Sequence, residues 1–432
     1  MRTRITDREG SVSLDSIDLF DPERFRSGSQ HTSWRTLRST APMWRQVDPG
    51  GIPFWSVTRY ADVLRVIKDH RRFSSEHGTI LAVLAGDTAG GRTINLMDPP
   101  HHACIRVPTM PLLSTSALTR AADGVRERVR RIMAPALTGD PVDVAEVVLG
   151  LPMAAVGHIV GVPPERWADV TRWTMAGVAP ADPHYAMGTP AETLRAVHSE
   201  LFELFGGLIE ERRAQPREDL ISRLLEVELD GRRMGVEDVV LNCYSFVMGA
   251  NTTTPHVAAH LMLALAEFPD EWQQVRAGAA PVSAVVEEAL RWTTPTNHLV
   301  RRVREPVEIN GVRLEAGESV AAWVASANRD ETMFEDPYRF RAGRRPNRHI
   351  AFGEGVHYCN GAPAARTVLT ALVEELLEHT ESFEVIGTVD HLYSNFINGI
   401  TALPMRLVPG RRSSAVSRRP VMSSTRHGAE VS

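Results

Sequence analysis

One helical pattern of unusual length, from Val236 to Glu267, constrains the fold more than any other feature of the sequence. Apolar residues recur there at spacings of three and four, and between Val239 and Leu265 they occupy nearly every face. A helix that is apolar all round is buried, and roughly 32 residues at ~1.5 Å rise each would cross a whole domain. The pattern therefore predicts a central helix over residues 236–267, enclosed by the rest of the 432-residue chain.

The other periodic segments are mostly helical. Strand-like segments are short and cluster at residues 54–58 and 306–324, the second with a turn at Asn310-Gly311. We therefore predict a mainly α protein with a minor β region. Three further helices are expected at residues 121–137, 191–215 and 284–292.

The absence of linkers and repeats predicts the domain organisation. No Gly/Ser-rich or Pro-rich linker and no internal repeat divides the chain. Residues 1–15 are polar and aperiodic, and residues 410–432 are rich in Ser and Arg with little to bury. We expect a flexible N-terminus over residues 1–15, a single domain over 16–409 and a disordered tail over 410–432.

Composition excludes several classes of protein. Hydrophobic residues make up 43% and charged residues 23%, as in ordinary globular proteins, and three cysteines cannot form a disulfide framework. A net charge of −5 gives no electrostatic reason to expect nucleic acid or a membrane surface as a partner. No apolar run approaches the ~20 residues of a membrane-spanning helix, and the N-terminus does not resemble a secretion signal. The expected location is the cytoplasm.

The segment from Phe352 to Arg366 carries the strongest chemical signal. Three glycines surround Cys359 and permit a tight loop whose backbone can approach a flat ligand closely. Pro363 suits the first turn of a helix, so Cys359 stands just before a helix N-terminus, where free N–H groups stabilise a thiolate. Such a thiolate is either a soft metal ligand or a nucleophile.

This segment resembles the heme-binding loop of the cytochromes P450, Phe-Gly-x-Gly-x-His-x-Cys-x-Gly, at every fixed position. Over residues 18–409 other motifs match in the family's order, with a spacing similar to that of its soluble bacterial members. The resemblance implies the cytochrome P450 fold, with the long central helix over the heme and Cys359 as the iron ligand. The further matches are Asp98 to Arg106, Glu288 to Arg291, Ala327 to Asp330 and Gly399 to Pro404.

Glu288 and Arg291 lie three residues apart on one helical face, a spacing that by itself contributes only ~0.2–0.5 kcal/mol. The family pattern brings Arg344 to the same carboxylate. The resemblance therefore implies a buried network that holds the cysteine loop and has a structural role.

The implied cofactor is heme b, whose two propionates require cations. The family pattern implies His102, Arg106, Arg301 and His349 as cofactor-binding residues. Among these, arginine is best suited to bind a carboxylate through two hydrogen bonds.

The long helix also contains the segment that corresponds to the family's oxygen-handling site, with O₂ as co-substrate. Gly249 removes bulk beside a planar cofactor, and Pro255, which has no N–H, frees the carbonyl of Asn251. By the resemblance, Thr253 takes the place of the catalytic alcohol, and Thr252 stands where the family has an acid. This is the chief departure from the family, and it leaves the proton-delivery route open.

These features favour a heme-thiolate monooxygenase that inserts one oxygen atom into a small organic substrate, in bacterial secondary metabolism. No flavin or iron–sulfur segment is present, so electrons would come from a separate ferredoxin or flavodoxin. The departure at Thr252 motivates an alternative, a heme-thiolate enzyme that oxidises without inserting oxygen, by coupling, desaturation or dehydration. A third interpretation, a cysteine hydrolase with His357 or His349 as base, explains none of the other motifs.

The substrate itself is not readable from the sequence. Walls of its pocket are expected from residues 73–95 and from the region of residues 178–188. The individual residues expected to contact the substrate are Ser245, Met248, Asn297, Phe396 and Ile397.

Overall fold

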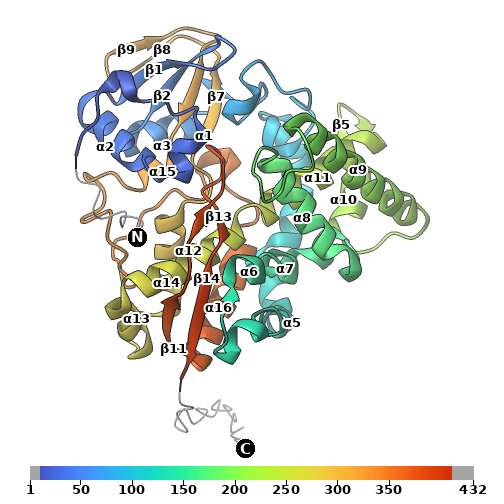
Figure 1. Ribbon diagram of the computed structural model, residues 1–432. Helices are drawn as coiled ribbons and strands as arrows, with labels where there is room; N and C mark the ends of the chain where they lie inside the picture. Colours follow the sequence, from blue (N-terminus) through green and yellow to red (C-terminus); the bar gives the residue numbers. More distant parts are fainter. Residues whose placement is uncertain (1–9, 411–432) are drawn as a thin grey trace, which may run out of the picture.

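A five-stranded sheet, several smaller sheets and a larger helical body make up the described part of the fold (Figure 1). The computed structural model describes residues 10–410, and the predicted mainly α architecture with a minor β region is confirmed. The α-helices are α1 (Pro22–Arg26), α2 (Gln30–Thr40), α3 (Tyr60–Lys68), α4 (His101–Thr109), α5 (Thr115–Met133), α6 (Val144–Val148), α7 (Leu151–Val160), α8 (Trp167–Val178), α9 (Pro190–Ala214), α10 (Leu220–Glu226), α11 (Val236–Asn251), α12 (Thr254–Glu267), α13 (Pro269–Arg276), α14 (Val282–Thr293), α15 (Val324–Ala327) and α16 (Ala362–His379). Short 3₁₀ helices are η2 (Leu14–Ser16), η3 (Leu81–Val83), η4 (Ile94–Leu96), η5 (Met110–Leu113), η6 (Ala134–Thr138), η7 (Pro164–Arg166) and η8 (Gly355–His357). The strands are β1 (Met43–Val47), β2 (Pro53–Val57), β3 (Phe73–Ser74), β4 (Val142–Asp143), β5 (Glu228–Leu229), β6 (Arg232–Arg233), β7 (Leu299–Val303), β8 (Val307–Ile309), β9 (Val312–Leu314), β10 (Ser319–Ala322), β11 (Thr380–Val385), β12 (Asp390–His391), β13 (Ile400–Ala402) and β14 (Pro404–Pro409).

The largest sheet has the strand order β1-β2-β10-β7-β3. Strand β10 pairs in parallel with β2 and antiparallel with β7, so it joins two segments that are far apart in the chain. The strands predicted at residues 54–58 and 306–324 are confirmed as β2 and as the β8–β9 hairpin followed by β10. Asn310 and Gly311 form the hairpin turn with positive φ angles of 49° and 74°, which such two-residue turns require.

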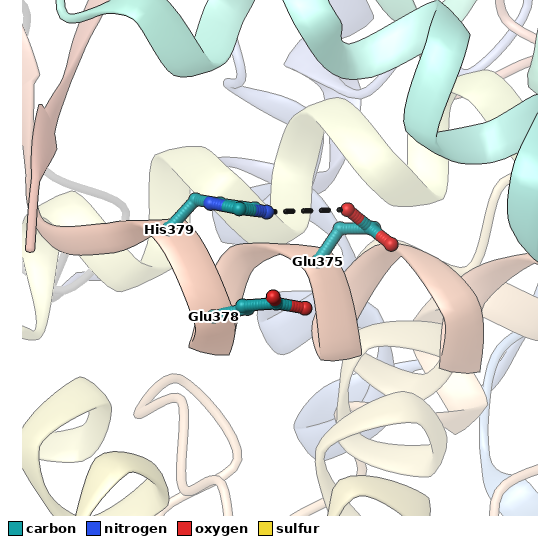
Figure 2. Close-up of side chains that lie close together, drawn as sticks. All are labelled: Glu375, Glu378 and His379. Atoms are coloured by element: carbon teal, nitrogen blue, oxygen red, sulfur yellow. Dashed lines mark ion pairs between the residues drawn. The ribbon is translucent and has the colours of Figure 1, made fainter. Parts of the chain in front are cut away.

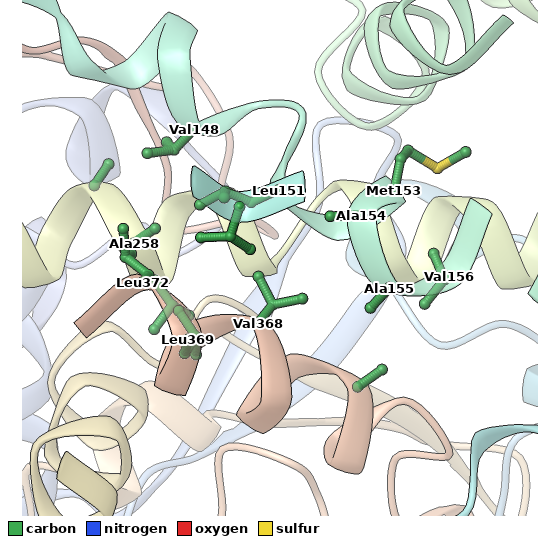
Figure 3. Close-up of a cluster of buried hydrophobic side chains, with 14 of the residues drawn as sticks. Val148, Leu151, Met153, Ala154, Ala155, Val156, Ala258, Val368, Leu369 and Leu372 are labelled. Carbon is green, nitrogen blue, oxygen red and sulfur yellow. The ribbon is translucent and has the colours of Figure 1, made fainter. Parts of the chain in front are cut away.

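The main hydrophobic core lies where three helices meet (Figure 3). Leu151 of α7 and Ala258 of α12 pack towards Leu372 of α16, and all three side chains are fully buried. Helices α12 and α16 therefore hold a fixed position relative to each other, because interiors packed in this way resist displacement. The helices predicted at residues 121–137, 191–215 and 284–292 are confirmed as α5 with η6, as α9 and as α14.

The predicted continuous helix over residues 236–267 is broken, and this corrects the sequence interpretation. Helix α11 ends at Asn251 and α12 begins at Thr254, with Thr253 at φ −122° and ψ −56°. Two threonine hydroxyls donate to carbonyls four residues back, Thr252 to Met248 at 2.8 Å and Thr253 to Gly249 at 2.9 Å. Such side-chain bonds compete with the helical ladder and bend helices, and the proline that follows starts α12 rather than continuing α11.

The attached part of the chain begins earlier than residue 16. The backbone N–H of Val12 donates to Thr36 Oγ1 at 3.1 Å, and Val12 and Leu14 pack against a buried apolar cluster that contains Trp34. At the other end, Gly410 N–H donates to His379 O at 3.0 Å. The flexible N-terminus and disordered tail that the sequence predicts fall mostly on residues 1–9 and 411–432, which lie outside the described residues. None of the helices within residues 10–410 is long and apolar enough to cross a membrane.

Candidate functional site

The cysteine loop, residues 352–361, contains η8 and ends where α16 begins. Cys359 N–H donates to Phe352 O at 2.9 Å, and Ala362 N–H donates to Cys359 O at 3.3 Å. Gly353 and Gly355 have φ angles of 70° and 73°, and a Cβ on Gly355 would stand 3.2 Å from the Lys68 backbone. The glycines are therefore required both by the turn and by its close approach to α3.

Cys359 is surrounded by protein, yet its thiol is accessible from an internal cavity. Burial raises the pKa of this thiol, while the backbone N–H groups of Gly361 and Ala362 and the guanidinium of Arg106 act in the opposite direction. The predicted donors at the helix start are thus present. An ion of positive charge bound at the sulfur would add to them and favour the thiolate.

The cavity measures about 360 Å³ and separates the cysteine loop from the end of α11 and the start of α12. Its walls are largely apolar, as small-molecule sites usually are. Gly249 lines it, and a Cβ placed on Gly249 would meet no atom within 4 Å. The missing side chain leaves room for a flat group against the helix. Predicted site residues that line the cavity are His102, Arg106, Ser245, Thr253, Arg301, Cys359 and Phe396.

Arg301 of β7 points a buried cation at this cavity. Only 3% of the residue is exposed, its Nη1 donates to Val300 O at 2.8 Å, and it pairs with no carboxylate within residues 10–410. Burial lowers its pKa to about 10, with Asp98 acting in the opposite direction. Arg106, half-buried, likewise forms no ion pair among the described residues and donates to Tyr358 O at 2.7 Å.

Two histidines complete this side of the cavity. The rings of His102 and His357 meet edge to face with centroids 4.5 Å apart, and His357 Nε2 lies 3.1 Å from Ser75 Oγ. Burial lowers the pKa of His102 to about 4 and that of His357 to about 2, so both are neutral near pH 7. Two uncompensated arginines and two neutral donors match an anionic group with two carboxylates, as heme has. The site therefore fits that cofactor.

His349 does not reach the cavity, contrary to the role that the resemblance implied for it. Its Nε2 lies 3.0 Å from Glu287 Oε2 on α14. His357, which sequence reasoning considered only as a base, occupies the expected place instead. The position of His357 in the sequence, two residues before Cys359 and within the cysteine loop, could have indicated this place.

The two threonines at the helix break face different surroundings. Thr253 lines the cavity, whereas Thr252 is 3% exposed and does not. Asn251, next to them, is fully buried, and neither polar atom of its side chain has a partner within the described chain. Of the two predicted catalytic residues, the structure brings only Thr253 to the cavity.

The predicted substrate contacts divide in the same way. Ser245 and Phe396 line the cavity, but Met248, Asn297 and Ile397 do not. Met248 lies beside Gly177 of α8, where an added Cβ would stand 3.2 Å from its Cε. The Asn297 side chain donates to Asn395 O at 3.1 Å, and Ile397 is 1% exposed.

Sequence reasoning placed Ser245 and the segment that ends at Asn95 on the cavity wall, but missed that these two residues form a polar pair. Ser245 Oγ donates to Asn95 Oδ1 at 2.7 Å, and both residues line the cavity. The loop that carries Asn95 is tied to α11, because Ile94 N–H donates to Asn242 Oδ1 at 2.9 Å and Asn242 Nδ2 donates to Arg92 O at 2.9 Å. Asn242 and Ser245 lie three residues apart on one face of α11, a spacing that could have indicated the contact.

The structure brings Glu288, Arg291 and Arg344 together beneath the site. Arg291 donates to both Glu288 oxygens at 2.8 Å, and Arg344 Nε lies 3.0 Å from each. Burial would raise the pKa of Glu288, but Arg291 and Arg344 outweigh it and lower that pKa. Both arginines also donate to carbonyls in residues 328–339, so the network connects α14 with the segment before the cysteine loop.

A second group of ligand-type side chains lies at the far end of α16 (Figure 2). His379 Nε2 lies 3.6 Å from Glu375 Oε2, with Glu378 on the same turn. Glu375 is already paired with Arg130 at 3.2 Å. This group does not line the cavity and takes no part in the site.

Comparisons with known proteins agree with this geometry. A family model described as Cytochrome P450 matches residues 281–391. Cytochrome P450 NovI of Streptomyces niveus is 32% identical over 400 residues, which covers 91% of this chain and 97% of that protein. Linalool 8-monooxygenase of Pseudomonas putida is 30% identical over 407 residues, covering 92% and 100%.

Solved structures show the same relationship. P450 OxyD, which is involved in the biosynthesis of vancomycin-type antibiotics, has 33% identity and a TM-score of 0.82, covering 91% of this chain and 100% of its own. Mycobacterium marinum CYP268A2, solved in complex with pseudoionone, has 29% identity and a TM-score of 0.84, covering 92% and 100%.

Fold and site together define an oxidoreductase of a heme-binding class. The chain belongs to the cytochrome P450 family. It is a P450 oxidoreductase of the monooxygenase kind, which uses heme iron and O₂, acts on a small molecule and receives electrons from a redox partner.

Proposed function

We propose that the protein is a heme b monooxygenase that inserts one oxygen atom into a small organic substrate in bacterial secondary metabolism. The observation that carries this proposal is the placement of Cys359 across a largely apolar cavity from Thr253. The likeness to OxyD, named for antibiotic biosynthesis, supports the metabolic setting.

Four residues would hold the heme propionates. Arg301 and Arg106 supply charge, and His102 and His357 supply neutral donors from the other side. Cys359 would be the iron ligand, with the N–H groups of the α16 start stabilising its negative charge. When bound, the heme supplies the activation of O₂.

Thr253 is the residue that would move a proton in the cavity. Its hydroxyl donates to Gly249 O and can accept a second hydrogen bond, so it is held in place and can pass a proton from a neighbouring water. Thr252 takes no part, because its hydroxyl is buried against Met248 O. The released end of α11 and any polar group of the substrate would then hold the water that the absent acid holds elsewhere.

The substrate would be mostly apolar with at least one group that forms hydrogen bonds. Phe396 and the aliphatic side chains of α7 supply the apolar wall, and the Asn95–Ser245 pair supplies the polar contact. An imperfectly matched polar group would leave that pair unsatisfied, at a cost of about 1–3 kcal/mol.

A separate ferredoxin, or a flavodoxin in its place, would deliver the electrons. The face beside the cysteine loop carries exposed apolar side chains on α4 and η5, with Val107 67% and Met110 49% exposed. Arg106 on the same helix contacts the loop directly. A donor that docks there would stand nearest to Cys359.

The decisive experiment is turnover of the heme-loaded protein with ferredoxin, its reductase and isotopically labelled O₂. Substrates are first found by spectral shifts in a library of small natural products. The proposal expects one labelled oxygen atom in the product and no product from Cys359→His. An oxidised product without the label would favour the alternative of coupling, desaturation or dehydration, and product from Cys359→His would remove the ligand assignment.

A further inference from the structure

Two adjacent glutamates on α14 have different partners. Glu288 is fully buried and binds Arg291 and Arg344. Glu287 is only partly buried, with 31% of its side chain exposed, and faces Arg366 of α16 instead. Its two oxygens accept from Arg366 Nε at 2.7 Å and from Arg366 Nη2 at 2.9 Å, a bidentate pair.

His349 holds the same carboxylate from a third direction. Ala351 N–H donates to His349 Nδ1 at 3.3 Å, which leaves the proton on Nε2 to be donated to Glu287 Oε2 at 3.0 Å. Only 4% of the His349 side chain is exposed. Glu287 is therefore fixed between a histidine and an arginine.

Arg366 connects this pair to the cysteine loop. Its Nη1 lies 3.1 Å from Tyr358 Oη, and its guanidinium carbon lies 4.6 Å from the centre of the Phe352 ring. Phe352 O accepts the N–H of Cys359, and Tyr358 precedes Cys359 in the chain. The charge of Arg366 is thus held against the two loop residues that adjoin the cysteine.

The charges at these positions oppose one another. Burial would raise the pKa of Glu287, but Arg366 and His349 outweigh it and hold that pKa at about 2, so the carboxylate is ionised. The hydrogen bond to Glu287 is the chief cause that raises the pKa of Arg366. Arg366 also favours negative charge on Cys359. Glu287, as the ion-pair partner of Arg366, partly neutralises that effect.

We propose that Glu287 and Arg366 form an electrostatic pair behind the Cys359 loop that sets the reduction potential of the bound heme, with His349 fixing the carboxylate. The two are positioning residues, since neither lines the part of the cavity above the cysteine. This inference rests on the proposed function, because it requires heme bound through Cys359. Reduction adds negative charge at the iron, so a neighbouring cation favours the reduced state and an anion opposes it.

The test is a spectroelectrochemical titration of the heme-loaded full chain and its variants. Glu287→Gln should shift the potential to more positive values, because it leaves the Arg366 charge unopposed. Arg366→Gln should shift it to more negative values. The double variant should lie near the wild type, and Arg366→Lys, which keeps the charge, should lie closer to the wild type than Arg366→Gln does.

Glu378→Gln, on the last turn of the same helix and away from the loop, is the matched control and should leave the potential unchanged. Shifts of the same sign in Glu287→Gln and Arg366→Gln, or an Arg366→Lys variant that behaves like Arg366→Gln, would overturn the inference. Each variant is first required to show the carbonyl absorption of a thiolate-ligated heme. A wild type without that absorption would instead refute the proposed function.

Discussion

Arg301 shows how much a single residue contributes to this site. A buried guanidinium on β7 of the five-stranded sheet, with no ion pair to a carboxylate of the described chain, is costly unless a ligand supplies the opposite charge. Its lowered pKa, about 10, has the same cause, since burial disfavours the charged form. A heme propionate would remove this cost by pairing with Arg301. Binding of the cofactor would therefore also stabilise strand β7.

We therefore expect Arg301→Leu to weaken heme retention by about 3–5 kcal/mol, the usual effect of removing one partner of a buried ion pair. Heme content after exhaustive dialysis measures this directly. Arg313→Leu is the matched control, because the Arg313 side chain is 71% exposed on β9. Equal heme content in the two variants would contradict the role assigned to Arg301.

Among single residues, the sequence correctly predicted site residues that belong to a motif. It did not predict cavity residues in extended segments, where neighbouring side chains point in opposite directions. Cys359 and Glu288 were found because a loop or a helical turn determines their surroundings. Asn297 and Ile397 were not cavity residues, whereas their neighbours Thr296 and Phe396 are. Successive side chains of an extended segment point to opposite faces, and no local motif in these two segments indicates which face meets the cavity.

At the scale of the element, the break between α11 and α12 is the feature that periodicity concealed. Apolar residues at helical spacing lie on both sides of Thr252 and Thr253, so the sequence predicted one helix. The threonine hydroxyls and Pro255 end the first helix and start the second, and the break places Thr253 on the cavity wall. The sequence could therefore predict which residues are helical. It could not predict the break, because the break depends on side-chain hydrogen bonds that hydrophobic periodicity does not reveal.

Thr253→Ala should lower the product formed per electron consumed and raise peroxide release, because the hydroxyl that passes the proton is gone. General acid–base assistance is typically worth about 10²–10⁴-fold in rate, which sets the scale of the loss. Thr252→Ala is the control, since its hydroxyl is buried away from the cavity and should leave the coupling unchanged. Product and peroxide measured per reduced donor compare the two, and full coupling in Thr253→Ala would exclude the proposed relay.

At the scale of the whole molecule, the mainly α architecture followed from periodicity and the family resemblance. The parallel pairing of β2 with β10 did not, because nothing local to either strand encodes it. The sequence also did not predict that several histidines are buried. His256, His260 and His298 are all buried, and burial lowers their pKa values to about 4, about 3 and about 3.

These histidines predict loss of stability in mild acid. Unfolded histidine has a pKa of about 6.5, so the unfolded chain binds protons first, and folded stability is full above about pH 6.5 and falls towards about pH 4. Each histidine contributes up to about 1.4 kcal/mol per pH unit in that window. Urea unfolding of the heme-loaded protein across the window measures the slope, which should be shallower in His260→Phe. A free energy of unfolding that stays constant through the window would contradict the prediction.

Hydrogen bonds between the Asn95 loop and α11 join two parts of the cavity wall. Asn242 binds the backbone on both sides of Thr93, and Ser245 binds Asn95, so the loop is fastened to the helix rather than to the sheet. Helix α11 ends at the break, beyond which α12 is fixed in the core. The position of α11 therefore sets two contacts at once: the helix carries Ser245 of the polar pair, and its end at the break places Thr253 on the wall of the same cavity.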